Sequence, residues 1–195
     1  MTAARLLLGA GLALACRLAA EDVVVFGKGD SRVLGPASQE RPRGAGDAAF
    51  LAAARRDFDG AAPYDAVFPL INPPAWGRVV SAATAGRLEI RRSFARGLVF
   101  RVAMEHLEPG HAYVLCINGR PQHPGNELLP ESVPGHEAEK YYDFYTLTAD
   151  AQGSYRGRIA LLLRPGPYNV HFYVKDASDF KIVLYGLEYF DFAAR

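Results

Sequence analysis

The sequence contains only two cysteines, Cys16 and Cys116, among its 195 residues. If Cys16 leaves with a leader or carries a lipid, Cys116 has no partner and no disulfide bond within the chain holds the fold. The domain must then stand on its hydrophobic core alone, which is feasible at this size. Half of the residues are apolar and 22% are charged, so we expect a sizeable core rather than global disorder.

The chain also lacks an excess of charge, because its formal net charge at pH 7 is +1. Proteins dedicated to nucleic acids usually present a basic field, so we expect no nucleic-acid partner. The sequence has no Gly-x-Ser-x-Gly, His-Glu-x-x-His, phosphate-loop or Cys-x-x-Cys motif. It therefore favours a protein that is not an enzyme and needs no cofactor, although a catalytic site assembled only in three dimensions stays open.

No apolar run is long enough to cross a bilayer of roughly 30 Å as a helix. The run from Leu6 to Ala15 follows the basic Arg5, and small residues come after it. This pattern is typical of a secretory signal peptide over residues 1–20, and it predicts a secreted, periplasmic or envelope-associated protein. A buried helix is the alternative, although Arg17 interrupts it.

Two cleavage points fit the small-x-small rule, one after Ala13-Leu14-Ala15 and one after Ala20. Cys16 resembles the lipidated cysteine of bacterial lipoproteins, but Leu14 stands where that motif prefers a small residue. A lipid at Cys16 is therefore the one route to a membrane that the sequence leaves open.

Residues 21–75 differ in composition from the rest of the chain. The segment 22–26 predicts one short strand, and the next twenty residues are rich in Gly, Pro and charge. Asp47 is expected to cap a short helix over Ala48–Arg56. Four prolines then interrupt regular structure: Pro63, Pro69, Pro73 and Pro74. We expect an irregular extension with one short helix here, packed along a sheet edge, and a separate domain at 76–195.

From Trp76 onward apolar residues recur with a period of two. Strands place successive side chains on opposite faces, so this period predicts half-buried strands. The alternating sets are Leu88/Ile90, Leu98/Phe100/Val102/Met104, Val170/Phe172/Val174 and Phe180/Ile182/Leu184. Turn signals separate them at 95–97, 150–153, 164–166 and 176–179. The sequence therefore predicts an all-β protein, an antiparallel β-sandwich of about seven to eight strands.

Two motifs carry a resemblance to known sandwich domains. Leu107-x-Pro109-Gly110-x-x-Tyr113 resembles the corner of fibronectin type III and related immunoglobulin-like domains. The resemblance implies that Tyr113 bonds back to the preceding connection. Pro109 would set φ, and Gly110 would adopt a backbone conformation that disfavours a side chain.

The second motif, Leu163-x-Pro165-Gly166-Pro167-Tyr168, is similar to the strand entry of transthyretin-like and carboxypeptidase-regulatory-like domains of secreted bacterial-type proteins. The hairpin at 146–159 fits the same pattern. The resemblance implies an architecture and says little about activity, because sites are grafted onto such folds.

A long proline-rich connection at 119–140 is the first candidate site, because loops of this length are often functional. His123, Asn126 and Glu127 are its candidate ligand contacts. Leu128 and Leu129 are expected to pin the loop to the sandwich, and a structural cover over a sheet edge is the other interpretation.

The same connection raises a metal alternative, since imidazole and carboxylate together can bind a divalent ion. His123, His136 and Glu137 would be the ligands of a metal-dependent extracytoplasmic enzyme or metal carrier. However, the two histidines stand far apart without helical or hairpin spacing, so a solvated loop is the competing interpretation.

The aromatic residues of the last sixty positions are the second candidate site. On alternation Phe172 faces the core, whereas Tyr173 and Tyr185 face outward. Outward tyrosines on a sheet can stack against sugar rings, although aromatics also fill sandwich cores. We therefore expect a protein or glycan partner at the cell envelope, bound by these tyrosines, the loop or both. A structural accessory domain without a ligand is a third hypothesis.

A basic group gathers around one predicted hairpin. Such arginines could meet an anionic lipid or polysaccharide, but the sequence favours their more common role of guarding a sheet edge. The group is Arg87, Arg91, Arg92, Arg96 and Arg101.

Overall fold

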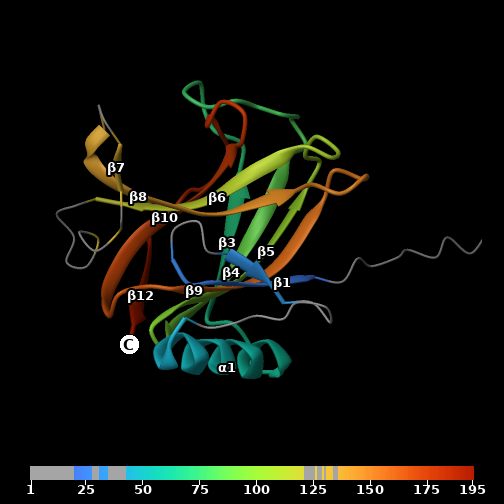
Figure 1. The fold of residues 1–195 in the computed structure, drawn as a ribbon. Coiled ribbons are helices and arrows are strands. Elements are labelled where there is room, and N and C mark those ends of the chain that lie inside the picture. The colour runs from blue at the N-terminus through green and yellow to red at the C-terminus, as the bar shows by residue number, and fades with distance from the viewer. Residues whose placement is uncertain are drawn as a thin grey trace, which may run out of the picture.

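The computed structural model describes residues 20–27, 31–34, 43–120, 126, 129, 131–133 and 136–195, which Figure 1 draws as a coloured ribbon. The prediction of a mostly β protein with one helix is confirmed for these residues. The predicted leader, with Cys16, lies outside them apart from Ala20. The elements are β1 (Glu21–Val25), β2 (Ser31–Val33), α1 (Ala45–Asp59), β3 (Ala66–Ile71), β4 (Ala85–Phe94), β5 (Gly97–Glu105), β6 (Ala112–Gly119), β7 (Glu131–Val133), β8 (His136–Thr148), β9 (Tyr155–Leu162), β10 (Gly166–Asp176), β11 (Ile182–Gly186) and β12 (Phe190–Ala194).

The strands form one hydrogen-bonded sheet in the order β2-β1-β9-β5-β4-β3-β11-β10-β6-β8-β7. β12 lies off this path and pairs with both β10 and β4, so β4, β3, β11, β10 and β12 close into a ring. Most neighbours are antiparallel, but β1 runs parallel to β9 and β12 runs parallel to β4.

The predicted antiparallel sandwich of seven to eight strands is therefore corrected to a mixed sheet of twelve strands in the described part of the chain. The physical reason lies in the two parallel pairings, which a sequence pattern cannot reveal. They join β1 to β9 and β12 to β4, which are distant in sequence, while β12 also pairs antiparallel with the nearby β10.

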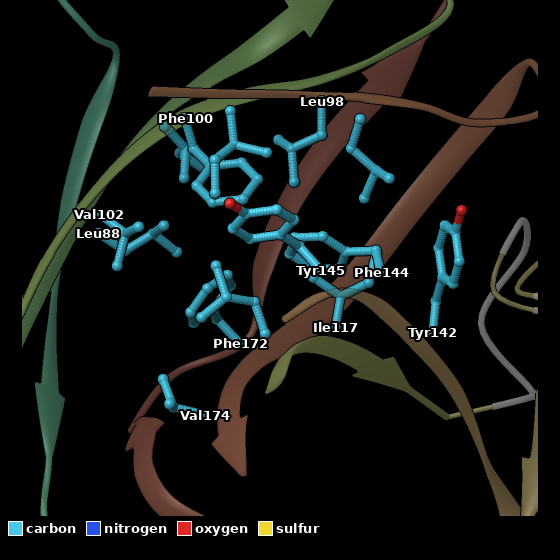
Figure 2. Close-up of a cluster of buried hydrophobic side chains, with 14 of the residues drawn as sticks. Leu88, Leu98, Phe100, Val102, Ile117, Tyr142, Phe144, Tyr145, Phe172 and Val174 are labelled. Atoms are coloured by element: carbon cyan, nitrogen blue, oxygen red, sulfur yellow. The ribbon is translucent and has the colours of Figure 1, made fainter. Parts of the chain in front are cut away.

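The hydrophobic core lies on the inner face of this sheet, and Figure 2 shows a cluster of its side chains. The alternation predicted over 98–105 is confirmed, because its four apolar members are at most 2% exposed. Phe100 of β5 contacts Phe172 of β10, with ring centroids 5.4 Å apart. Phe144 of β8 contacts Phe100 at 5.8 Å. These edge-to-face pairs join distant strands, and each fully buried ring stabilises the fold by about 1.5–3 kcal/mol.

Helix α1 covers part of the outer face of the sheet, as Figure 1 shows. Phe50, Leu51 and Phe58 are buried there and form a second core with Val24 and Val99. The helix packs because one of its faces is apolar, which is the usual source of helix stability in proteins.

The predicted cap of this helix is wrong. The helix starts at Ala45 with Gly44 at its N-cap and no side-chain cap hydrogen bond. Asp47 lies in the first turn instead, where its carboxylate accepts from the Arg43 amide at 3.3 Å. An acidic side chain in a first turn is still favourable, because it faces the free amides of that turn.

Residues 21–75 contribute several elements to the sheet and its cover. The strand predicted at 22–26 is present as β1. β3 lies between β4 and β11, although it contains Pro69. Pro69 is accommodated because β3 pairs there with β4 alone; its pairing with β11 is confined to Leu70 and Ile71.

One member of the predicted alternation near the C-terminus is misplaced. Phe180 lies in the turn before β11, with φ 58° and 59% of its surface exposed. Val183 and Leu184 of β11 are fully buried instead. The turn at 176–179 is placed as predicted, but β11 starts two residues after Phe180.

Candidate binding surface on the outer face of β10 and β11

An unbroken series of aromatic side chains crosses the outer face of β10 and β11. Tyr173 of β10 pairs in register with Tyr185 of β11, and their ring centroids are 6.5 Å apart. Trp76, from the loop after β3, packs edge-on against Tyr185 at 5.4 Å. The alternation thus predicted the correct face for both tyrosines, and the loop adds a tryptophan to them.

The series continues beyond Tyr173 in the other direction. His171, two residues earlier on β10, contacts Tyr173 with centroids 5.8 Å apart. It stacks on Tyr189 at 3.6 Å, and the guanidinium of Arg120 lies over the Tyr189 ring at 5.4 Å. We call Trp76, Tyr185, Tyr173, His171 and Tyr189 the aromatic row; Arg120 places a positive charge at its far end.

The rings of the aromatic row differ in exposure. Trp76 is 57% exposed, whereas Tyr173 at its centre is 8% exposed. Tyr185, His171 and Tyr189 are half-buried. The surface offered to a ligand therefore comes from the two ends and from ring edges, and Tyr173 acts mainly as the packed centre that holds its neighbours.

Polar side chains continue this outer face beside the row. Lys175 of β10 donates to the Asp143 carboxylate of β8 at 2.7 Å and lies over the Tyr141 ring at 4.8 Å. Burial acts to lower the pKa of Lys175, but the neighbouring Cys116 and Asp143 outweigh burial, so that its pKa is raised. The lysine is therefore charged at neutral pH and supplies a fixed ion pair next to the rings.

Cys116 lies beneath this ion pair, opposite Tyr173 and Asp143 in the register. It is a free cysteine and is fully buried. Burial raises the pKa of the Cys116 thiol well above its ordinary value. Such a thiol is a packed side chain rather than a nucleophile, because reactivity requires the thiolate.

The candidate loop residues are only partly described. Asn126 is fully buried: its amide donates to the carbonyl oxygens of Arg120 at 2.9 Å and Asn169 at 2.7 Å, and its oxygen accepts from the Asn169 amide at 3.0 Å. Asn126 therefore fastens the loop to β10 instead of presenting a ligand contact. Leu129 is buried as predicted.

The proposed metal ligands stay a prediction, because His123 and the side chains of His136 and Glu137 lie outside the described residues, although the backbone of the last two begins β8. The candidate ligand contact Glu127 also lies outside the described residues. Within the described residues no group of three or more His, Cys, Asp or Glu is arranged to hold a metal ion.

The first corner motif has the geometry of a tyrosine-held turn. Tyr113 is fully buried, and its hydroxyl accepts from the Glu108 amide at 3.0 Å. Pro109 and Gly110 form the turn between them, and Gly110 has φ 70°. A side chain at Gly110 would be strained in this left-handed conformation.

The second motif forms the same kind of tyrosine-held turn at the start of β10. The Tyr168 hydroxyl donates to the Arg164 carbonyl oxygen at 2.7 Å, across Pro165 and Gly166. The Tyr168 ring stacks on Phe192 of β12 with centroids 4.9 Å apart. This corner fixes the beginning of the strand that carries His171, Tyr173 and Lys175.

The remaining members of the row were not predicted as site residues. His171 stands two residues before Tyr173 on β10, and this spacing places both side chains on one face of the strand. Trp76, Tyr189 and Arg120 lie outside regular alternation, in connections, so no period in the sequence relates them to the tyrosines.

No protein-family model matches the chain, and neither a curated protein nor a solved structure is significantly similar to it. Within the described residues, no helix has both the length and the apolar character needed to cross a bilayer.

Proposed function

We propose that the protein is a secreted or envelope-associated binding protein, not an enzyme, and that it recognises a glycan through the aromatic row. The observation that carries the proposal is the unbroken contact series from Trp76 through Tyr173 to Tyr189 on one outer face. The signal-like N-terminus supports the location, and the absence of catalytic motifs supports a binding role.

The chemistry of the row suits a sugar ligand. Sugar rings present apolar C–H faces that pack on flat aromatic rings, while their hydroxyl groups need hydrogen-bond partners at the edge. Here the rings are accompanied by the Lys175–Asp143 ion pair and by Arg120. An apolar strip with charged neighbours therefore meets both requirements of a sugar.

The two corner motifs support a narrower structural proposal. We propose that they are the same local device as the tyrosine corner of fibronectin type III, immunoglobulin-like and transthyretin-like domains. The hydrogen bonds of Tyr113 and Tyr168 support it. The strand order of the whole sheet is a separate matter, so the proposal concerns the corners alone.

The experiment uses Trp76, which is the only tryptophan in the sequence and therefore reports on the row alone. Purified protein is titrated with neutral oligosaccharides, namely chitotriose, cellotriose and maltotriose, and tryptophan emission is recorded. We expect a saturable change with at least one sugar. Tyr185→Ala and Tyr189→Ala should each weaken that affinity about tenfold, because a well-packed aromatic contact contributes on the order of 1–2 kcal/mol.

The control is Phe180→Ala, which removes an aromatic ring that is 59% exposed, more than the half-buried Tyr185 and Tyr189, and that belongs to no ring contact among the described residues. Its affinity should stay within about twofold of the parent protein. Tyr173 is changed to Phe rather than to Ala, because it is packed. No saturable change with any sugar, or equal losses in Phe180→Ala and Tyr185→Ala, would overturn the proposal.

A further inference from the structure

A second surface feature lies on a different part of the outer face, beside the area that α1 covers. It is a groove of about 420 Å³ across β4, β5 and β9, and an adjoining hollow of about 320 Å³ shares Arg87, Ala103 and Arg156 with it. We call it the arginine groove. The charged residues that line it are Arg87, Arg101, Arg156, Arg158, Glu89 and Glu105.

The strand register explains the shape of the arginine groove. Arg87 of β4 lies opposite Ala103 of β5, and Ala103 lies opposite Arg156 of β9. Neighbouring strands are about 4.8 Å apart, so the two arginines are separated by roughly 10 Å. Only the methyl group of Ala103 lies between them. Ala20 and Gly157 also line the groove. Small residues therefore leave the hollow, and guanidinium groups border it.

The next set of paired residues along these strands adds more positive charge. Arg101 lies directly opposite Arg158, and like charges in opposed positions of a sheet are destabilising. The lining as a whole has four arginines and two glutamates. A sheet that places cations side by side around a hollow is suited to an anion that joins them.

Arg158 is the fixed member of the groove. Its guanidinium holds the Asp22 carboxylate in a bidentate pair, at 2.5 and 2.6 Å, and donates to the Phe58 carbonyl oxygen at 2.6 Å. These contacts join β1, β9 and the end of α1. Arg158 is therefore fully engaged and contributes charge and structure rather than a free donor.

The other three arginines hold their carboxylate partners loosely, although Arg101 also lies over the Tyr64 ring, with its guanidinium carbon 4.4 Å from the ring centroid. Glu89 lies 3.3 Å from Arg87 and 3.8 Å from Arg101, and Glu105 lies 3.4 Å from Arg156. The arginine side chains are 66%, 43% and 48% exposed, in the order Arg87, Arg101 and Arg156. Exposed ion pairs of this kind contribute little, so a stronger anion can take the place of the glutamates.

The register also changes the role expected for these arginines. β4 and β5 are both interior strands of the sheet, with neighbours on each side. Arg87 and Arg101 therefore do not guard an edge. They stand on the exposed face of paired strands, where a ligand can reach them.

We propose that the arginine groove binds a ligand that carries at least two oxyanion groups, carboxylate or phosphate, held between Arg87 and Arg156 with Arg101 beside them, two residues from Ala103 along β5. Guanidinium groups bind such oxyanions through paired, charge-assisted hydrogen bonds. This site is separate from the aromatic row, and its ligand is recognised by charge instead of by ring stacking.

The test uses probes without rings, so that the aromatic row does not contribute. Tricarballylate supplies carboxylates and tripolyphosphate supplies phosphates, and calorimetry at low salt measures the affinity of each for the whole chain. We expect saturable binding of at least one. The preferred probe identifies the oxyanion chemistry of the ligand.

Two variants give the proposal its sharpest test. Arg87→Gln/Arg156→Gln should weaken binding at least about tenfold, because both walls lose their charge. Glu89→Gln should strengthen binding a few-fold, on the order of threefold, because it removes the carboxylate that competes for Arg87 and Arg101. A gain of affinity cannot arise from misfolding.

The matched control is Arg164→Gln/Arg195→Gln, which removes the same charge from exposed arginines at the far ends of β9 and β12. Its affinity should change less than about twofold. The proposal is wrong if neither probe binds, if the control loses as much affinity as Arg87→Gln/Arg156→Gln, or if Glu89→Gln leaves the affinity unchanged or lower.

Discussion

The aromatic row and the arginine groove occupy the same outer surface of one sheet, with β3 between the strands that carry them. In the row, aromatic rings pack against one another in edge-to-face, tilted and stacked contacts, and charge lies at its margin. In the groove, small residues form the floor and guanidinium groups form the walls. One region offers dispersion contacts and the other offers Coulomb attraction.

The comparison also shows what the two regions share. Phe172 lies beneath the row, and Phe100 lies beneath the groove. Both side chains are fully buried, and their ring centroids are 5.4 Å apart. The inner face is thus one continuous core, while the outer face differs from strand to strand. Stability and recognition are separated across the thickness of the sheet, as expected for sites grafted onto a scaffold.

The largest effect should come from a substitution in the hydrophobic core that the two regions share. Phe172→Ala should lower the free energy of unfolding by about 3–5 kcal/mol, because it leaves a cavity in the centre of the core. Denaturant unfolding followed by circular dichroism measures this change. Both binding activities should then fall together as folded protein is lost. As a control, Val67→Ala alters a side chain that is 63% exposed and should be nearly neutral; a comparably small loss for Phe172→Ala would contradict the shared core.

Salt should separate the two regions. Raising NaCl from about 0.05 M to about 0.5 M shortens the Debye length from roughly 14 Å to about 4 Å. Oxyanion binding at the arginine groove should weaken about tenfold or more, whereas sugar binding at the aromatic row should change less than about twofold. Calorimetry for the first and Trp76 fluorescence for the second measure both in the same buffers. Parallel salt dependence at the two sites would show that they do not differ in the way described.

The smallest effect, which is near zero at neutral pH, concerns two tyrosines of the shared core at alkaline pH. Burial first, and then the Glu21 carboxylate, raise the pKa of Tyr155 on β9 and of Tyr145 on β8 above the ordinary value of 10.0. The folded protein keeps these tyrosines protonated while the unfolded chain ionises them. Their contribution to stability is therefore complete below pH 10 and is lost as the pH rises above it, by up to about 1.4 kcal/mol per pH unit for each.

Tyr155→Phe tests this linkage. Its free energy of unfolding should fall less steeply than that of the parent between pH 9 and pH 11, as measured by urea unfolding at each pH. Tyr155→Phe/Tyr145→Phe should flatten the curve further. An unchanged slope in the double variant would show that these two hydroxyl groups do not cause the alkaline instability.

Much of the sheet was predictable because alternation reports directly on which face of a strand is buried. The core-facing residues of β5 and β10, Leu98/Phe100/Val102/Met104 and Val170/Phe172/Val174, are buried as predicted, although Val99 and Tyr173 on the opposite face are buried as well. β3 was missed because Pro69 reads as a break, although its missing amide costs little where the strand has one neighbour. The order of the strands could not be predicted, because the alternation of apolar residues in one strand does not indicate which strand pairs with it.

In the candidate site, too, the residues in strands were predictable and the residues in connections were not. Tyr173 and Tyr185 were assigned to the outer face from alternation alone, and the register brings them together. Trp76 and Tyr189 come from connections, whose paths depend on the closed ring of strands. Asn126 was predicted as a ligand contact because it is a polar loop residue. Its side-chain amide instead forms hydrogen bonds with the backbone of Asn169 in β10, and so attaches the loop to that strand.

The closing strand β12 has a consequence for how the protein is made. It bridges β10 and β4, which is encoded about a hundred residues earlier, so a nascent chain that ends before Phe190 has a gap between those two strands. The ring of strands can therefore close only after β12 leaves the ribosome. A chain stalled or clipped just short of that point would expose the ring of Tyr168, which stacks on Phe192 of β12 in the complete sheet, and would be a natural target for chaperones and proteases.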